Sequence, residues 1–478
     1  MRFHRLVSWV NTPRGLVCLF AAGLTVRLVI ARISEGLWFD VTLFRLWSDR
    51  LVERGPSGFY LPPAEYEVDY PPGYLYVLLA LGKASRALLG GPPSTAMLKL
   101  PAMLTDLGVA VLAMLLAARV TPASMKDRIR AVAAAAILFN PGLVLTSAAW
   151  GQVDSVLALF VLAIVYTLAG PPNIRRESCA VGLFAVAAAS KPQVVFALPI
   201  LGVFLVWRHM SDGWSALGRL TALALLGGAV AAAMFLPFGV SPIDMVGFYG
   251  EAPSRSLYPF TSLWAFNVWG AAGFYRPDVG AGAVRIGGVA AMYVGLAAFA
   301  LMTAAIVVRC WKSLVNGLEP ETVVLFGAAA MTCAAFSLLT RMHERYLYLA
   351  VVALTPLVAD RRFRWALAVL SICFLLNVHF VYVLHSHQAS PPGAAWTIQP
   401  LYDLLFGHAQ DAAARKALSV ITAASCLGVA FLGWRWLDPM PRRVTSRKAG
   451  CESTMSAHAS QHLERPLPEP PVPISGTP

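Results

Sequence analysis

The chain of 478 residues contains few charged side chains. Asp, Glu, Lys and Arg make up 13% of it, against roughly a quarter of an average soluble protein. Hydrophobic residues make up 58%, and the mean hydropathy is +0.64. A globular protein of this composition would not be soluble in water. The sequence therefore excludes a soluble protein and predicts an all-α polytopic membrane protein.

The sequence also lacks the cysteine patterns of a metal site. Its seven cysteines are scattered, mostly in apolar runs, with no C-x-x-C pair, so we expect small core residues. A fixed-period repeat is absent. The basic, apolar N-terminus continues past Arg27 without a convincing small-residue cleavage site, which favours an uncleaved first span over a signal peptide.

Apolar runs recur to about residue 436 and predict about twelve crossings within one transmembrane domain, residues 1–438. The expected spans are 15–31, 97–118, 130–148, 153–170, 177–190, 192–208, 219–237, 286–308, 321–339, 346–359, 364–382 and 416–436. With this count every short basic loop falls on the side of both termini, which the positive-inside rule makes cytoplasmic. The same bias explains the net charge of +13, so no nucleic-acid partner is implied.

Long polar segments then lie on the opposite, extracytoplasmic side. We expect a large first loop at residues 32–96 and a second at 237–285, with a third at 383–415. Counting residues 70–91 as a crossing would place a basic loop outside, so an interfacial or re-entrant helix is expected there. Residues 439–478 have little to bury and predict a disordered cytoplasmic tail.

Ionisable residues at the ends of spans are costly in a membrane protein, which makes them candidates for function. Asp40, in WFDVTLFRLWSDRL, lies on one helical face with Phe44 and Trp47. It suits a general base that accepts a proton from a hydroxyl; the alternative is a helix cap. Asp69, before two prolines, is the reserve acid or part of a turn.

Two further external motifs carry polar residues that a turn does not need. In WGQVDS, Trp150 suits a stacking surface for a sugar or isoprenoid, and Gln152 and Asp154 suit hydrogen bonds to substrate. A tight turn with a capping Asp154 is the alternative. In SKPQ, Lys191 suits a phosphate group and Gln193 supplies an amide for substrate; snorkelling of the lysine is the alternative.

The segment RMHERY places two arginines, a histidine and a glutamate close together between two apolar spans. Arg341, His343 and Arg345 suit the binding of a phosphate or diphosphate, and Glu344 suits the orientation of one of them.

These motifs in this order resemble the GT-C class of polyprenyl-phosphate-sugar glycosyltransferases. Two branches are most similar: bacterial relatives of the second mannosyltransferase of glycosylphosphatidylinositol-anchor synthesis, and the glucosyltransferases that use dolichyl-phosphate glucose. The resemblance covers roughly residues 35–350 and fades beyond about residue 360. The matching segments are Asp40 with Phe44 and Trp47, DYPP from Asp69, NPGLVL from Asn140, WGQVDS from Trp150, KPQ from Lys191 and HERYL from His343.

The resemblance implies a GT-C-like bundle with a large first external loop and Asp40 as general base. The expected reaction is inverting transfer of a hexose from a polyprenyl-phosphate sugar to an extracytoplasmic glycan or lipid, with mannose as the first guess and glucose or arabinose next. Without a compact carboxylate set we predict metal-independent transfer and no cofactor, although some members of the class use a divalent ion.

Two other classes fit the composition. A secondary transporter or lipid flippase also has many spans and buried polar residues, but it tends to show paired repeats with binding groups near the midplane. A noncatalytic subunit would show no transfer of its own. A bacterial plasma membrane is the expected location, because the loops are compact and a retention signal is absent.

Overall fold

The computed structural model describes residues 12–61, 70–244, 259–388 and 412–437, and every structural statement below concerns this part of the chain. The expected tail at 439–478 lies outside it. The α-helices are α2 (Pro13–Ile33), α3 (Trp38–Arg54), α4 (Pro72–Leu89), α5 (Thr95–Val120), α6 (Lys126–Leu138), α7 (Pro141–Val144), α8 (Asp154–Leu168), α9 (Ile174–Ser190), α10 (Leu198–His209), α11 (Trp214–Phe235), α13 (Val268–Ala272), α14 (Ala291–Val315), α15 (Pro320–Leu338), α16 (Tyr348–Leu354), α17 (Arg361–Gln388), α19 (Ala412–Leu432) and α20 (Trp434–Leu437). The strands β1 (Arg285–Ile286) and β2 (Val289–Ala290) form one short antiparallel hairpin. The all-α prediction is confirmed.

Eight helices within the described ranges are long and apolar enough to cross a bilayer. They are Pro13–Ile33, Thr95–Val120, Pro192–His209, Trp214–Phe238, Ala291–Val315, Pro320–Leu338, Arg361–His385 and Ala413–Leu432. Each coincides with an expected span, and together they make the chain a multi-pass membrane protein.

The four remaining expected spans fall on shorter or broken helices. Helix α8 has 15 residues, or about 22 Å of rise, against about 30 Å of hydrocarbon. Helices α9 and α16 have 17 and 7 residues. The fourth is a pair bent by 42°, Ala123–Leu138 and Pro141–Trp150. The total of about twelve crossings therefore stays a prediction.

Local chemistry explains the break in the bent pair. Pro141 has no backbone N–H to continue α6, and the side chain of Asn140 instead accepts hydrogen bonds from the amides of Gly142 and Leu143, at 3.0 and 3.3 Å. A π-helical turn, Leu145–Trp150, follows and ends at Gly151, whose φ of +95° favours glycine. The chain thus reaches Trp150 through a short, irregular and buried segment.

The expected first loop contains two packed helices, α3 and α4. Phe44 and Trp47 of α3 are almost fully buried, and both rings lie against Tyr70, just before α4. At Gly82 a side chain would collide with Ser48, so glycine permits the close approach of the two helices. Helix α4 is not among the eight helices above, and the interfacial or re-entrant helix expected at residues 70–91 stays a prediction.

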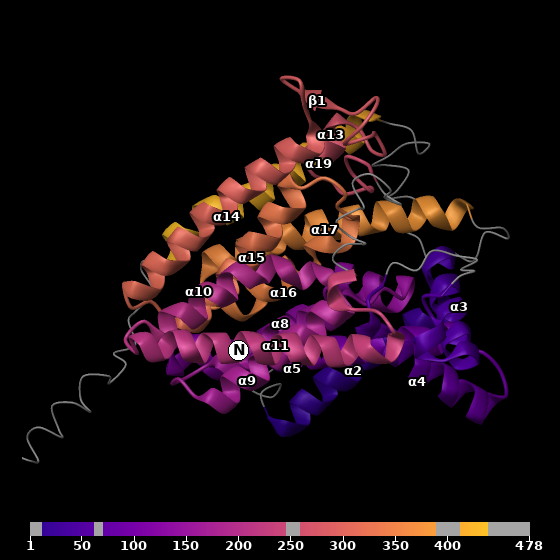
Figure 1. Cartoon of the computed structure of the whole chain (residues 1–478), viewed down its shortest axis with the longest axis horizontal. Helices are drawn as coiled ribbons and strands as arrows, with labels where there is room; N and C mark the ends of the chain where they lie inside the picture. Colours follow the sequence, from indigo (N-terminus) through magenta and orange to yellow (C-terminus); the bar gives the residue numbers. More distant parts are fainter. Residues whose placement is uncertain (1–11, 62–69, 245–258, 389–411, 438–478) are drawn as a thin grey trace, which may run out of the picture. The chain divides into compact units, whose positions relative to one another are not determined.

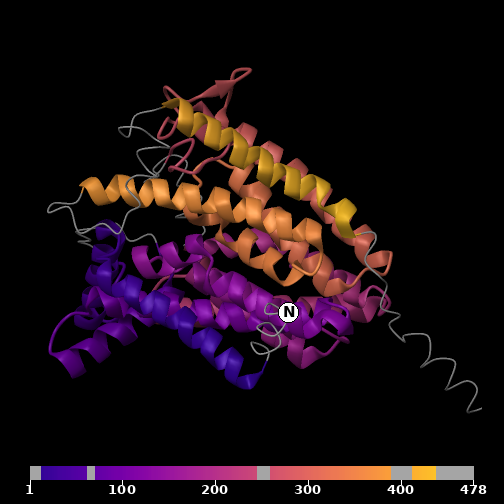
Figure 2. The same ribbon diagram turned by 180° about the vertical axis from the view of Figure 1, so that it is seen from behind.

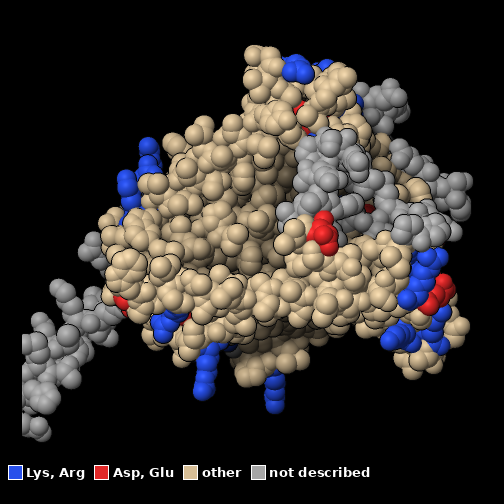
Figure 3. Space-filling model, viewed as in Figure 1, with Lys and Arg blue, Asp and Glu red and all other residues tan. Residues whose placement is uncertain are grey.

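The helices pack in two sets that meet at α7, α8, α10, α16 and α17 (Figures 1 and 2). Helices α2 to α11 make most of their contacts with one another, as do α13 to α19, whereas α16 packs on α8 and α10 packs on α14 and α15. On the face seen in Figure 3, charged side chains lie mainly near the edges around a broad uncharged area, which suits a lipid-facing surface.

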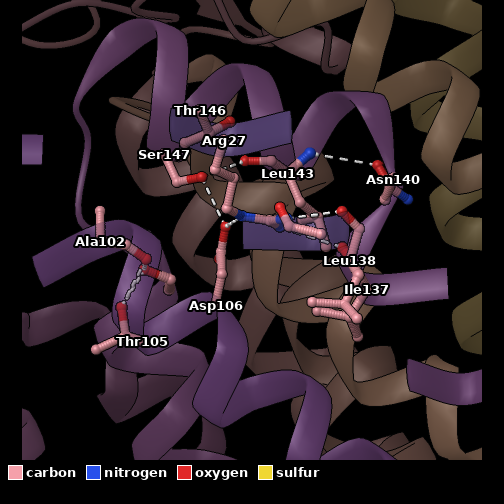
Figure 4. Close-up of polar contacts among 12 residues, drawn as sticks. Arg27, Ala102, Thr105, Asp106, Ile137, Leu138, Asn140, Leu143, Thr146 and Ser147 are labelled. Atoms are coloured by element: carbon pink, nitrogen blue, oxygen red, sulfur yellow. Dashed lines mark hydrogen bonds and ion pairs between the residues drawn. The ribbon is translucent and has the colours of Figure 1, made fainter. Parts of the chain in front are cut away.

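A buried ion pair joins the first set internally (Figure 4). Arg27 of α2 donates to Asp106 of α5 at 2.8 Å, and both side chains are fully buried. The same guanidinium donates to the carbonyl of Leu138 at 2.6 Å, so it satisfies the broken end of α6. Asp106 also accepts from the hydroxyls of Ser147, at 2.6 Å, and Tyr348.

Candidate functional site

Asp40 and Trp150, which are far apart in sequence, form a hydrogen bond. The indole Nε1 of Trp150 donates to Oδ2 of Asp40 at 2.7 Å. The backbone supports the contact, because the amide of Leu37 donates to the carbonyl of Trp150 at 3.0 Å. Leu37 occupies the cap position of α3 without a side-chain cap, so the capping alternative for Asp40 is wrong. Its carboxylate is partly exposed and faces the π-helical turn.

The WGQVDS, KPQ and HERYL motifs meet around Asp154. Lys191 donates from Nζ to Oδ1 of Asp154 at 2.7 Å, and each side chain is only 3% exposed. Nε of Arg345 lies 3.7 Å from the other oxygen, Oδ2. Arg345 also donates to Glu344 at 2.8 Å. Asp154 opens α8 and Lys191 ends α9, so helix ends bring these charges together.

Aromatic rings and His343 complete what we call the central cluster: Asp40, Trp150, Asp154, Lys191, His343, Glu344 and Arg345. The guanidinium of Arg345 lies 5.9 Å from the centre of the Trp150 ring, and the ammonium of Lys191 lies 6.0 Å from that of Tyr70. Nδ1 of His343 lies 3.7 Å from a carboxylate oxygen of Glu344.

Burial and neighbouring charges shift the ionisation of this cluster. Burial lowers the pKa of Lys191, although the charge of Asp154 opposes that shift. Burial and then the charge of Arg345 lower the pKa of His343, which favours its neutral imidazole. Burial opposes ionisation of Glu344, but Arg345 and His343 together outweigh it and hold its pKa at about 2.

Several buried polar atoms in and beside the central cluster have no hydrogen-bond partner in the described part of the chain. They are the side-chain oxygens of Gln152 and Gln193, together with Oδ2 of Asp154 and Nε of Arg345, which face each other as an ion pair at 3.7 Å but are too far apart for a hydrogen bond. Buried polar atoms are normally satisfied, so the two glutamine oxygens and this loose ion pair mark a place where a polar ligand can bind. The two glutamines were expected to bind substrate, and their unpaired oxygens are available for it.

Arg341 makes other contacts. Its guanidinium donates to both oxygens of Asp278, at 2.8 and 2.9 Å, and Thr340 donates to the same carboxylate at 2.7 Å. This pairing fixes the segment before His343 against residues 259–278. The expected phosphate-binding role of Arg341 stays a prediction, as does the reserve role of Asp69, which lies outside the described residues.

Sequence reasoning missed Asp106 and Asp278. Asp106 lies in the middle of an expected span, where an ionisable residue is itself a signal. Asp278 lies in a long polar loop, where one acid among many polar residues gives no such signal. Within the described ranges, no group of three or more His, Cys, Asp or Glu residues is arranged to hold a metal ion.

No family model matches the chain, and no curated protein matches its sequence. Solved structures similar to it include the crystal structure of ArnT from Cupriavidus metallidurans bound to undecaprenyl phosphate, with a TM-score of 0.49 and 16% identity over 88% of this chain and 78% of that one. The apo form of the same protein gives 0.44 and 15% over 87% and 77%. Both scores are too low to carry an argument about fold or function. The geometry itself defines a multi-pass helical membrane protein with a buried, partly unsatisfied ionic cluster.

Proposed function

We propose that the chain is an inverting GT-C type glycosyltransferase that moves a hexose from a polyprenyl-phosphate sugar to an extracytoplasmic glycan or lipid acceptor. The observation that carries the proposal is the central cluster. Its residues come from four separate motifs of the set that resembles this class, and direct contacts join them.

Asp40 suits the general base in this reaction. The Trp150 N–H holds its Oδ2, which orients the carboxylate and leaves Oδ1 for the acceptor hydroxyl. The acceptor oxygen forms a bond to the anomeric carbon while its proton passes to Asp40. The bond from that carbon to the phosphate oxygen breaks, and the lipid phosphate leaves with the electron pair. Attack from the face opposite the phosphate inverts the anomeric configuration.

Lys191, Arg345 and His343 suit the donor phosphate. Both cations already have carboxylate partners, which hold them in place before the substrate arrives. Each keeps further N–H donors, including Nε of Arg345, which lies 3.7 Å from Asp154 and makes no hydrogen bond to it. Burial makes their attraction to developing negative charge stronger than it would be in water.

The transporter alternative requires polar binding groups near the middle of the spans. Arg27 and Asp106 are such residues, but each is fully buried and already bonded to several partners. The unsatisfied polar atoms of the four motifs lie instead at helix ends and turns, at Asp154, Gln193 and Arg345, although His379 and Thr303 also have unsatisfied atoms within long helices. The placement of the four motifs favours an enzyme at the membrane surface.

Mannose is the first sugar to test and glucose or arabinose the next. We place the chain in the plasma membrane with both termini cytoplasmic and the active site on the extracytoplasmic side, following the charge bias of the loops.

The deciding experiment measures transfer of labelled sugar from a panel of polyprenyl-phosphate sugars in proteoliposomes. Asp40→Asn should abolish most transfer. Asp49→Asn is the matched control, since Asp49 is on the same helix but pairs with Arg86 at the surface. Equal rates in the two variants would remove Asp40 as the base. Donor lipid that crosses the bilayer without losing its sugar would instead establish a flippase.

A further inference from the structure

A second recess lies beside the central cluster, between α13, the segment after it and the start of α19. Helices α13 and α19 pack together here (Figure 1). The recess has a volume of about 390 Å³, within the usual range for small-ligand sites. Trp264, Phe274 and Tyr275 line it together with Arg415 and Lys416, and we call it the aromatic pocket.

The walls of the aromatic pocket are held in a strained backbone conformation. Trp264 and Tyr275 have φ values of +66° and +52°, which bulky side chains rarely adopt. Among the described non-glycine residues, only Arg341 shares this property. The Trp264 ring centre lies 5.1 Å from those of Phe274 and Tyr275, and Asn377 donates to the carbonyl of Trp264 at 2.7 Å. Strain kept in place by such contacts is typical of ligand-binding sites.

The charge of the aromatic pocket is positive and unbalanced. Among the residues that the structure describes, Arg415 and Lys416 line it and no acidic residue does. Nε of Arg415 is buried and has no hydrogen-bond partner among the described residues, while its guanidinium lies 5.9 Å from the centre of the Phe274 ring. A buried N–H donor beside aromatic faces calls for an anionic or strongly polar acceptor.

The aromatic pocket adjoins the central cluster through paired backbone. Leu263 donates from its amide to the carbonyl of Met342 at 3.0 Å, and both Leu263 and Trp264 form bridges with His343. The charges of Glu344 and Arg345 also act on Tyr275, whose pKa rises to about 12 mainly through burial. A ligand in the pocket therefore lies next to the groups proposed to hold the donor phosphate.

We propose that the aromatic pocket binds an anionic sugar unit of the acceptor. This inference rests on the proposed function. One face of the sugar ring stacks on Trp264 and Phe274, and its phosphate or carboxylate accepts from Arg415 and Lys416. The acceptor class is therefore a glycan or glycolipid that carries negative charge close to the sugar that receives the transfer.

The test measures binding of labelled glucose 6-phosphate to the purified full-length protein, with saturating undecaprenyl phosphate present to fill the donor site. Binding of glucose, which lacks the phosphate, and of inorganic phosphate, which lacks the sugar ring, is measured separately. Each should bind more weakly than glucose 6-phosphate. Arg415→Gln should weaken glucose 6-phosphate binding about tenfold through loss of a charge-assisted hydrogen bond. Phe274→Leu keeps an apolar side chain but removes the stacking face, and should weaken binding as well.

Arg285→Ala is the matched control, because Arg285 is an exposed arginine of the same region whose guanidinium donates to the carbonyl of Gly288 at 2.9 Å. Unchanged binding in both pocket variants would overturn the inference. Phosphate that binds as tightly as the sugar phosphate would overturn the sugar part of it.

Sugar-transfer kinetics separate this inference from the proposed function. The acceptor pocket and the transferase function are both supported if Arg415→Gln raises the acceptor KM and leaves the donor KM unchanged. Normal acceptor kinetics in an active Arg415→Gln enzyme would overturn the pocket alone. If no donor is used but glucose 6-phosphate binding still depends on Arg415, the pocket binds anionic sugars, whereas the transferase proposal and the acceptor role fail.

Discussion

Removing Arg27 tests whether the buried ion pair holds the membrane domain together. Arg27→Met keeps most of the side-chain length but leaves Asp106 as a buried carboxylate with only hydroxyl partners, Ser147 and Tyr348. Breaking a buried pair in this way costs about 3–5 kcal/mol. The carbonyl of Leu138 also loses its donor, which adds about 1 kcal/mol. We expect a total loss of roughly 4–6 kcal/mol.

The partner substitution should cost less. In Asp106→Asn the guanidinium of Arg27 keeps the carbonyl acceptors Gly23, Ile137 and Leu138, at 3.2, 3.4 and 2.6 Å. The double variant removes both charges, so its loss should be smaller than the sum of the two single losses by about 2 kcal/mol or more.

The assay is reversible unfolding by SDS in mixed micelles, which gives the free energy of unfolding for each variant. Arg86→Met is the control, since Arg86 forms exposed pairs with Asp49 and Glu53 and should cost less than about 1 kcal/mol. A cost for Arg27→Met as small as the control, or additive losses in the double variant, would refute the reasoning.

Three other predictions concern the central cluster. Trp150→Phe removes the N–H that orients Asp40, so kcat should fall about 10- to 100-fold with little change in donor KM; steady-state kinetics measure both. Lys191→Gln should raise the donor KM and destabilise the protein by leaving Asp154 unpaired. Adding Asp154→Asn should restore unfolding free energy but not activity, and recovery of both would contradict a role in donor binding. Glu344 has a folded-state pKa of about 2, below its unfolded value, so its stabilising effect is present above about pH 4.5 and is lost as the pH falls towards 2. Unfolding measured against pH should show a wild-type loss of about 3 kcal/mol over that interval that Glu344→Gln lacks, and identical slopes would contradict the assignment.

Part of the candidate site was predictable because its signals are local. Lys191 and Arg345 are charged residues next to apolar spans, and such placement is rare without a function or a partner. The sequence alone also allowed Asp40 to be a helix cap, because a carboxylate near the start of a helix can accept hydrogen bonds from its first amides. Only the observed cap at Leu37 and the bond from Trp150 excluded it.

The sequence by itself determined the all-α class and the eight long spans, because hydrophobicity and the absence of backbone partners in lipid act along each segment separately. The break at Pro141 was missed, because residues 130–148 were expected as one span, although the missing N–H is a property of that residue alone. The sequence did not determine which charged residues pair with one another. Lys191 and Asp154 are 37 residues apart, Arg27 and Asp106 are 79 apart, and Tyr348 reaches Asp106 over 242 residues. Several cations and carboxylates satisfied the same local rules, and only the packing of helices decided which of them met, because the energy of an ion pair depends on distance and burial.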